Sequence, residues 1–203
     1  FHPNVEITRL IAIDRVGEPI GEVHNSLYGK TDLRVENVPV EDVAPEVDAM
    51  FFALPHKTTA EIAMRVFDSG VPLIDLSGDF RLQSADAYAA YYAPGHPCHE
   101  ESASFVYGMP ELNREALKSA KRVASPGCFA TTIALGLLPV ARAGVLDGPC
   151  RVVAMTGSSG SGAAARATTH HPVRAKNLRT YKPLNHQHTP EIEQTLRLAG
   201  ANE

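Results

Sequence analysis

The 203-residue chain has only three cysteines and no tryptophan. The cysteines are Cys98, Cys128 and Cys150; they form no CxxC pair and their number is odd, so neither a disulfide framework nor a structural zinc site is expected. Such sparse thiols are typical of a reducing compartment, and we expect a cytoplasmic protein. The sequence lacks an initiator methionine, and no cationic segment followed by an apolar core stands at its start, so no signal peptide is visible.

Long hydrophobic runs are absent as well. The longest uncharged apolar stretch, residues 128–140, is too short to span a bilayer and is interrupted by Thr131, Thr132 and Pro139. With 44% hydrophobic and 21% charged residues, the composition is that of an ordinary globular protein. We therefore expect no membrane helix and no membrane partner.

Acidic residues are missing from the interval between Asp147 and Glu191. The same interval is rich in cationic and imidazole side chains: Arg151, Arg166, His170, His171, Arg174, Lys176, Arg179, Lys182, His186 and His188. A positive field of this kind raises the local concentration of anions. The whole chain has a formal net charge of −4 and the interval has few aromatic residues, which argues against a nucleic-acid partner. A small phosphorylated ligand is the favoured interpretation.

Strand-like and helical patterns alternate in the first part of the chain. Apolar runs predict strands at three places: residues 5–14, 47–54 and 71–76. Between the second and the third, Thr58 and Glu61 have capping-box spacing and apolar residues recur at helical intervals, which predicts a helix over 59–69. A strand, a helix and a strand in succession form a βαβ unit, and this predicts a parallel sheet.

The rest of the chain is less regular. Residues 83–104 show no clear period, which predicts an irregular segment. Further elements are expected at these places: a helix near 114–120 with Asn113 as N-cap, a strand at 122–124, a helix over 129–142, a strand at 152–155 and a helix at about 190–198. Shifts in composition place a domain boundary between residues 125 and 150.

Cys128 is the strongest candidate for chemistry. It follows Ser125-Pro126-Gly127 at the corner where the predicted strand becomes a helix. The free N–H groups and positive dipole at the start of that helix favour a thiolate over a thiol. The same N–H groups could hold the oxyanion that forms when the sulfur attacks a carbonyl carbon. The alternative is a packed, inert cysteine, which is the commoner fate of a single Cys in apolar surroundings.

A thiolate nucleophile needs an acid or base partner, and His186 and His188 lie just before the predicted C-terminal helix. A pair of histidines two residues apart also occurs in metal sites. No third ligand is spaced near it and the surrounding charge is positive, so a metal is not expected here. The segment His96-Pro97-Cys98-His99 resembles a metal knuckle but is interpreted as an exposed loop.

Three other features could bind an anion. The Gly/Ser-rich run at 156–162 is either a cradle of backbone amides or a flexible loop. His170 and His171 with Arg174 form either an anion-binding loop or a solvated one. Arg81 lies beyond the carboxyl end of a predicted parallel strand, where open α/β sheets bind ligands. Its alternative role is an ion pair with Asp79 or Asp75.

Six blocks in a fixed order carry a resemblance to a known family. They are Ala53-Leu54-Pro55-His56, Ile74-Asp75-Leu76-Ser77-Gly78-Asp79-Phe80-Arg81, Tyr107-Gly108-Met109-Pro110-Glu111-Leu112, Ser125-Pro126-Gly127-Cys128, Gly157-Ser158-Ser159-Gly160-Ser161-Gly162 and His186-Gln187-His188-Thr189-Pro190-Glu191-Ile192. Together they span nearly the whole chain and resemble the N-acetyl-γ-glutamyl-phosphate reductases. They also resemble the lysine-pathway enzymes that reduce a carrier-linked aminoadipyl phosphate and, more distantly, the aspartate-semialdehyde dehydrogenases.

The resemblance implies an α/β fold. It consists of a Rossmann-like parallel sheet domain over residues 1–127, followed by part of a second α+β domain for catalysis and dimerisation over 128–203. The family's opening βα unit with its Gly-rich turn is not recognisable here, and family chains continue beyond Glu203. We therefore expect these residues to be part of a longer polypeptide.

The resemblance also assigns roles to individual residues. Cys128 is the expected nucleophile, which takes the acyl group from an acyl phosphate as a thioester that NADPH then reduces. His186 is the first choice of acid/base and His188 the second, while Glu191 orients a histidine or binds substrate. The expected substrate contacts are Arg81, Arg174, Tyr181 and Lys182; the expected cofactor contacts are Pro55, His56, Ser158 and Gly160.

The implied function is reduction of N-acetyl-γ-glutamyl phosphate to the semialdehyde in arginine biosynthesis, with release of phosphate. The alternative is reduction of a carrier-linked or N-acetylated aminoadipyl phosphate in lysine biosynthesis. The expected partners are the small acyl phosphate, further copies of the chain in a dimer or tetramer, and an amino-group carrier protein.

Overall fold

The computed structural model describes residues 2–162 and 164–201. At its centre lies a parallel sheet of four strands in the order β3-β4-β6-β5. The strands are β3 (Met50–Phe52), β4 (Leu73–Asp75), β6 (Arg122–Ala124) and β5 (Val106–Tyr107). The parallel βαβ unit predicted from the sequence is confirmed, with β3 and β4 paired in register from Met50 opposite Leu73. The fold is the expected α/β fold with a Rossmann-like sheet.

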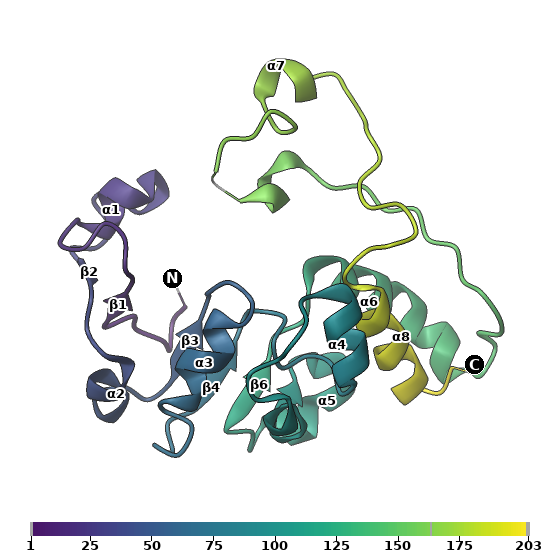
Figure 1. Ribbon diagram of the computed structural model, residues 1–203, viewed down its shortest axis with the longest axis horizontal. Helices are drawn as coiled ribbons and strands as arrows, with labels where there is room; N and C mark the ends of the chain where they lie inside the picture. Colours follow the sequence, from purple (N-terminus) through teal and green to yellow (C-terminus); the bar gives the residue numbers. More distant parts are fainter. Residues whose placement is uncertain (1, 163, 202–203) are drawn as a thin grey trace.

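Helices accompany these strands, while α1 and α7 lie away from the four-stranded sheet (Figure 1). The α-helices are α1 (Ile20–Val23), α2 (Val40–Val43), α3 (Thr58–Met64), α4 (Ala85–Tyr91), α5 (Pro110–Leu117), α6 (Cys128–Arg142), α7 (His171–Arg174) and α8 (Thr189–Leu198). The 3₁₀ turns are η1 (Asn25–Leu27), η2 (Ala44–Glu46), η3 (His99–Ser104) and η4 (Ser158–Ser161). Helix α6 packs against α8, although the two are far apart in the sequence.

The core lies between the sheet and the helices α2 and α3. Phe52 and Leu73 of the strands pack there against Ala60 and Ala63 of α3. Phe80 stacks on Phe105 with ring centroids 4.0 Å apart and closes this core below the loop that follows β4. Alanine on the inner face of α3 lets the helix approach the strands closely, so the carboxyl ends of β3 and β4 are held firmly.

Two regions leave this body (Figure 1). The first strands, β1 (Leu10–Ile11) and β2 (Val35–Glu36), form a separate parallel pair beside α1. The strand expected at 5–14 is thus reduced to Leu10 and Ile11, because only these residues have a partner strand. Residues 151–162 and 164–187 belong to an extended excursion that carries η4 and α7 away from the sheet.

The predicted strand at 152–155 is wrong. In the described structure this segment has no partner strand and no regular structure, and Val153 and Met155 are 96% and 80% exposed. A β-branched apolar sequence forms a strand only when a neighbouring strand satisfies its backbone.

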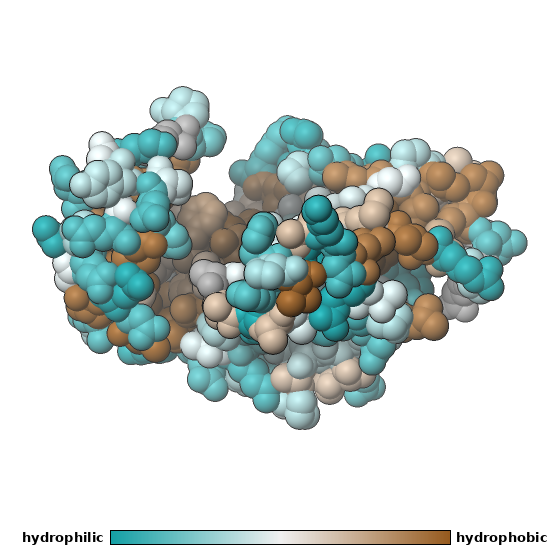
Figure 2. All heavy atoms as spheres, turned by 90° about the horizontal axis from the view of Figure 1, so that it is seen from above, coloured by the Kyte–Doolittle hydropathy of each residue, from teal (hydrophilic) through white to brown (hydrophobic). Residues whose placement is uncertain are grey.

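Apolar side chains gather at the right-hand end of Figure 2, which is the end of the molecule that holds α6 and α8.

Three further predictions need correction. The capping box at Thr58 is absent, because the carboxylate of Asp79 caps α3 instead. The segment at 83–104 contains α4, whose first turn is capped when the hydroxyl of Ser84 accepts from the N–H of Ala87. The helix near 114–120 begins earlier, at Pro110, and Asn113 lies inside it, where its side-chain amide donates to the carbonyl oxygen of Tyr107.

Within residues 2–162 and 164–201, no helix combines the length and the apolar character that a bilayer crossing requires.

Candidate functional site

Cys128 stands at the corner between β6 and α6, as predicted. The chain leaves β6 at Ala124 and enters α6 directly at Cys128, with Gly127 in an extended conformation at the helix N-cap (φ −67°, ψ 152°). The N–H of Ser125 donates to the carbonyl oxygen of Asp75 over 2.7 Å, which ties the corner to the end of β4. The Cys128 side chain is exposed at the carboxyl edge of the sheet.

Glu191, in the first turn of α8, lies far from Cys128 in the sequence, but its side chain reaches this corner. Its side chain is fully buried. One carboxylate oxygen, Oε1, accepts from the N–H of Gly127 at 2.8 Å and from the hydroxyl of Tyr107 at 2.7 Å. The other oxygen, Oε2, lies 3.6 Å from the guanidinium of Arg81. The carboxylate hydrogen-bonds the loop before Cys128 and neither of the two predicted imidazoles.

Arg81 is buried beneath the same loop. Its Nε donates to the carbonyl oxygen of Ser125 at 2.7 Å and its Nη2 to that of Leu76 at 2.8 Å. Its ion-pair partner is Glu191 and not Asp75 or Asp79. The guanidinium therefore holds the two loops at the carboxyl ends of β4 and β6 together.

The ring of His188 lies directly against Gly127. A Cβ atom built on Gly127 would stand 2.4 Å from Nε2 of this ring, so only glycine leaves room for it. The His188 side chain is buried, and burial, helped by the neighbouring His186 and the positive charge of Arg81, lowers its pKa to about 4. His188 is therefore neutral at neutral pH. In the described part of the chain, its Nδ1 is a buried atom without a hydrogen-bond partner.

His186 lies beside the residue that follows Cys128. Its ring centroid is 5.2 Å from that of Phe129 and 4.9 Å from that of His188. Its Nδ1 accepts the backbone N–H of His188 at 3.2 Å, which assigns the proton of the neutral ring to Nε2. Partial burial and the nearby Lys182 lower the pKa of His186. The two imidazoles thus flank the Cys128 corner, one against the preceding residue and one against the following residue.

The turn after β3 brings Pro55 and His56 to the same edge of the sheet. His56 Nδ1 accepts the N–H of Gly78 at 3.0 Å, and its ring packs edge to face on Tyr92 at 4.9 Å. Burial lowers the pKa of His56. The N–H of Lys57 donates to Asp79 at 2.9 Å, which holds the turn in place even though Lys57 has a positive φ of 70°.

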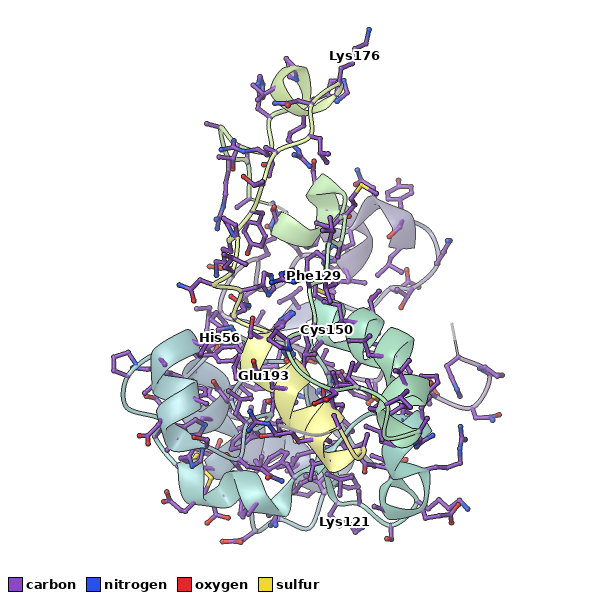
Figure 3. The ribbon with its side chains drawn as sticks, turned by 90° about the vertical axis from the view of Figure 1, so that its right-hand side faces the viewer. His56, Lys121, Phe129, Cys150, Lys176 and Glu193 are labelled. Carbon is purple, nitrogen blue, oxygen red and sulfur yellow. The ribbon has the colours of Figure 1, made fainter. Side chains whose placement is uncertain are left out.

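The predicted residues of the basic interval separate into two groups. Tyr181 reaches the site, because its ring centroid lies 5.5 Å from that of His186; Lys182 donates to the side chain of Gln187 at 3.0 Å. Arg174 instead donates to the hydroxyl of Ser158 at 3.3 Å, within the excursion. Figure 3 shows Lys176 at the far tip of that excursion, well away from His56 and Phe129.

The His96–His99 segment is not the exposed loop that was predicted. Cys98 is buried, and His96 Nε2 donates to the carbonyl oxygen of Asp79 at 2.7 Å. These side chains pack against the core because Tyr88 and Phe80 cover them. In the residues that the structure describes, no three His, Cys, Asp or Glu side chains are grouped as a metal ion would require.

Sequence reasoning did not predict what several residues do in the site; Asp79 was considered only as an ion-pair partner of Arg81, and Tyr107, Gln194 and Tyr88 were given no role. Tyr107 holds Glu191, Asp79 holds the turn at Lys57, and Gln194 donates to the carbonyl oxygen of Arg81 at 2.9 Å. Tyr88 in turn donates to Asp79 at 2.7 Å. These partners are far apart in the sequence and no local spacing marks them. Only the position of Tyr107 and Asp79 inside two of the matched blocks was a signal.

Taken together, the parallel sheet and the exposed thiol at its carboxyl edge, with an imidazole on each side of the corner, define an α/β fold of the dinucleotide-binding class. Two family models match the chain: the semialdehyde dehydrogenase NAD-binding domain at residues 1–120 and the semialdehyde dehydrogenase dimerisation domain at residues 128–203. The chain belongs to the semialdehyde dehydrogenase family.

Individual relatives carry two kinds of name. A putative LysW-L-2-aminoadipate 6-phosphate reductase of Thermomicrobium roseum is 42% identical over 98% of this chain and 56% of its own length. A LysW-L-2-aminoadipate 6-phosphate reductase of Deinococcus radiodurans is 40% identical over 96% of this chain and 56% of its own length. An N-acetyl-gamma-glutamyl-phosphate reductase of Moorella thermoacetica is 40% identical over 98% of this chain and 58% of its own length. The chain thus spans somewhat more than half the length of the curated relatives it matches.

Proposed function

We propose that the protein containing this chain is an NADPH-dependent acyl-phosphate reductase. It reduces N-acetyl-γ-glutamyl phosphate to N-acetylglutamate semialdehyde and releases phosphate. The observation that carries the proposal is the exposed thiol of Cys128 at a strand-to-helix corner, with an imidazole on each side. Relatives that are named phosphate reductases support this reaction class.

The chemistry begins at the sulfur. The Cys128 thiolate attacks the acyl carbon, the bond from that carbon to the phosphate oxygen breaks, and inorganic phosphate leaves with the bonding electrons. The first N–H groups of a helix have no partner within it, and those of α6 are proposed to stabilise the oxygen that becomes negative during the attack. The product of this step is a thioester on Cys128.

His186 is the proposed proton donor and acceptor. Its Nε2–H is free to donate to the oxygen of the reacting carbonyl, because Nδ1 is already engaged by the N–H of His188. His188 is the second candidate for this role, but its ring is almost fully buried behind Gly127 and its lowered pKa makes it a poor donor at neutral pH. The exposure of the two rings therefore favours His186.

The cofactor site is proposed at the carboxyl edge of β3, where Pro55 and His56 end the strand. Asp79 already accepts the N–H groups of Lys57 and Ala60 at the start of α3, whereas His56 accepts from Gly78 through Nδ1 and so carries its proton on Nε2, which is the proposed donor to the cofactor. Ser158 and Gly160 would complete the contacts from the Gly/Ser-rich run. When bound, NADPH supplies the hydride that reduces the thioester to the aldehyde.

The basic interval is proposed to recognise the acidic substrate. Tyr181 and Lys182 lie near His186, so they are placed to contact the acyl chain or its phosphate. Arg174 extends the positive charge outward along the excursion, and Arg81 acts from beneath the loop. A second candidate substrate is a carrier-linked or N-acetylated aminoadipyl phosphate, which the LysW in the names of several relatives favours.

Domain division and assembly are further parts of the proposal. We place the dinucleotide-binding domain at residues 1–127 and the catalytic and dimerisation domain at 128–203. The description of the second family model supports assembly of copies into a dimer or tetramer through the second domain. For the aminoadipyl substrate, an amino-group carrier protein is the expected partner.

The test uses the full-length protein and the absorbance of NADPH. With N-acetyl-γ-glutamyl phosphate the protein should oxidise NADPH, and Cys128→Ser should reduce turnover by roughly four orders of magnitude. Cys150→Ser is the matched control, because Cys150 is also exposed but lies outside the corner, and it should retain full turnover. Equal turnover of the wild type and the Cys128→Ser variant would exclude the thioester mechanism.

The substrate is settled by comparing acyl phosphates on the wild-type protein. The glutamyl and aminoadipyl chains differ by one methylene, which is worth about 1–3 kcal/mol in a pocket, or a 10- to 200-fold difference in kcat/KM. A higher kcat/KM for the carrier-linked aminoadipyl phosphate would assign the protein to lysine biosynthesis in place of arginine biosynthesis. The proposed reaction class would stay the same.

A further inference from the structure

The carboxylate of Glu191 is the best-connected polar group near the Cys128 corner. It is fully buried, so water does not solvate it and the protein must supply its hydrogen bonds. Its oxygen Oε1 takes the N–H of Gly127 and the hydroxyl of Tyr107, and Oε2 faces the guanidinium of Arg81. A group with no exposed surface cannot contact substrate, which separates it from the exposed thiol it supports.

We propose that Glu191 is a positioning residue: by holding the N–H of Gly127 it fixes the backbone that presents Cys128, and Tyr107 and Arg81 hold its carboxylate for this task. The inference rests on the proposed function, because turnover by Cys128 is one of its readouts. It differs from the roles expected from the sequence, in which Glu191 orients a histidine or binds substrate.

The hydrogen bond to Gly127 acts one residue before the nucleophile. Residues 125–127 are the whole connection between β6 and α6, and the two ends of this connection are held separately. Ser125 is held by Asp75 and by Arg81, whereas Gly127 is held by Glu191. Loss of the Glu191 bond therefore leaves the N–H of Gly127 without this partner, directly before Cys128, while the carbonyl oxygen of Gly127 keeps its bonds from Thr131 and the strand end stays in place.

Tyr107 is suited to be a permanent donor. Burial and the neighbouring Glu191 raise the pKa of its phenol well above the ordinary value, so the hydroxyl stays protonated. It donates over 2.7 Å from β5, the edge strand next to β6. The guanidinium of Arg81 adds the positive charge that a buried carboxylate requires.

Helix α8 brings Glu191 into place through bonds of its own. Gln194, one turn along the helix, accepts the N–H of Gln83 at 2.8 Å and donates to the carbonyl oxygen of Arg81 at 2.9 Å. Thr195 donates back to the carbonyl oxygen of Glu191 at 2.7 Å. These bonds fix α8 on the sheet domain, and the carboxylate of Glu191 connects this fixed helix to the corner at Cys128.

The decisive experiment compares Glu191→Gln and Tyr107→Phe with Glu193→Gln in the full-length protein. Glu193 lies on the same helix but is exposed, which makes it the matched control. Misplacement of a catalytic group by about 1 Å costs up to about 100-fold in rate, so we expect kcat to fall about 100-fold for Glu191→Gln and about tenfold for Tyr107→Phe. KM should change by less than about twofold, and the control should match the wild type.

Hydrogen exchange of the Gly127 amide gives a second readout that does not depend on activity. We expect faster exchange at Gly127 in both variants, and unchanged exchange at Ser125, whose N–H is bonded to Asp75. If Glu191→Gln fails to fold, the same two measurements on Tyr107→Phe still test the inference, because this substitution removes one hydroxyl and keeps the ring.

Two results would overturn the inference: a normal kcat with normal Gly127 exchange, or a raised KM with unchanged kcat, which would indicate substrate binding. The proposed function fails separately. If Cys128→Ser keeps its turnover, the reaction is wrong, whereas an inactive Cys128→Ser beside a normal Glu191→Gln leaves the reaction intact and removes only the positioning role.

Discussion

Replacing Gly127 by alanine tests the packing at the centre of the site. The backbone of Gly127 lies in the extended region that alanine also adopts, so the substitution introduces no backbone strain. The new Cβ would lie 2.4, 2.6 and 2.8 Å from three atoms of the His188 ring, about 1 Å closer than an ordinary contact. Since His188 is buried, the ring cannot swing aside without opening the site.

The expected cost follows from two opposing effects. Forced overpacking costs about 1–3 kcal/mol. The loss of backbone freedom in the unfolded chain offsets about 0.4–1 kcal/mol of it. Gly127→Ala should therefore lower the free energy of unfolding by about 1–2 kcal/mol. Gly136→Ala is the control: no atom lies within 4 Å of its Cβ, and replacing a glycine within α6 should stabilise the protein by up to about 1 kcal/mol.

Urea denaturation of a double-mutant cycle measures this effect. In a His188→Ala background the clash is removed, so Gly127→Ala should become neutral or slightly stabilising, with a coupling of at least about 1 kcal/mol between the two sites. Additive effects of the two substitutions would refute the contact between the His188 ring and Gly127.

Two further perturbations follow from the structure. The pKa of His188 is lowered to about 4 by burial, so the unfolded state binds more protons than the native state between about pH 6.5 and pH 4. As the pH is lowered through this window, the free energy of unfolding should fall by up to about 1.4 kcal/mol per pH unit. Urea denaturation across pH should show a flatter slope for His188→Gln than for the exposed control His171→Gln. Asp79→Ala removes the carboxylate that caps α3 and holds the turn at Lys57, so thermal unfolding should show that the free energy of unfolding falls by at least about 1–2 kcal/mol. Ser84→Ala removes the cap of α4 and should lower it by about 1 kcal/mol. Equal losses for the two variants would contradict the larger role of Asp79.

Local patterns predicted the βαβ unit of the sheet and the strand-to-helix corner at Cys128. The apolar runs became β3 and β4 with a helix between them, and this arrangement depends mainly on hydrophobic periodicity; the outer residues of each strand are buried, whereas Phe51 in the middle of β3 is exposed. Cys128 at the start of α6 was likewise predicted, since Pro126 and Gly127 mark the end of a strand and the start of a helix.

Contacts between distant residues were not predictable in the same way. The capping box expected at Thr58 does not form because α3 is capped one residue earlier, at Lys57. The carboxylate of Asp79, which lies in the loop after β4, accepts the N–H groups of Lys57 and Ala60 there. Helix α4 was missed because Tyr88 is its one fully buried residue, so its hydrophobic period is faint. The network of Glu191 joins three chain segments, and only folding brings Tyr107 and Gly127 to it.

Burial distinguishes the thiols in a way that the sequence did not. Cys98 is packed in the core, where burial raises the pKa of its thiol to about 11, whereas Cys128 and Cys150 are exposed. Alkylation at neutral pH should therefore spare Cys98. It should modify Cys128 faster than Cys150 because only Cys128 stands at the start of a long helix.

The most direct measurement is mass spectrometry of the full-length protein mixed with N-acetyl-γ-glutamyl phosphate in the absence of any dinucleotide. Because the acyl group cannot be reduced, it should accumulate as a thioester on the peptide that contains Cys128, with one phosphate released for each subunit modified. Phosphate release without an adduct, or an adduct on Cys150 in place of Cys128, would contradict the account.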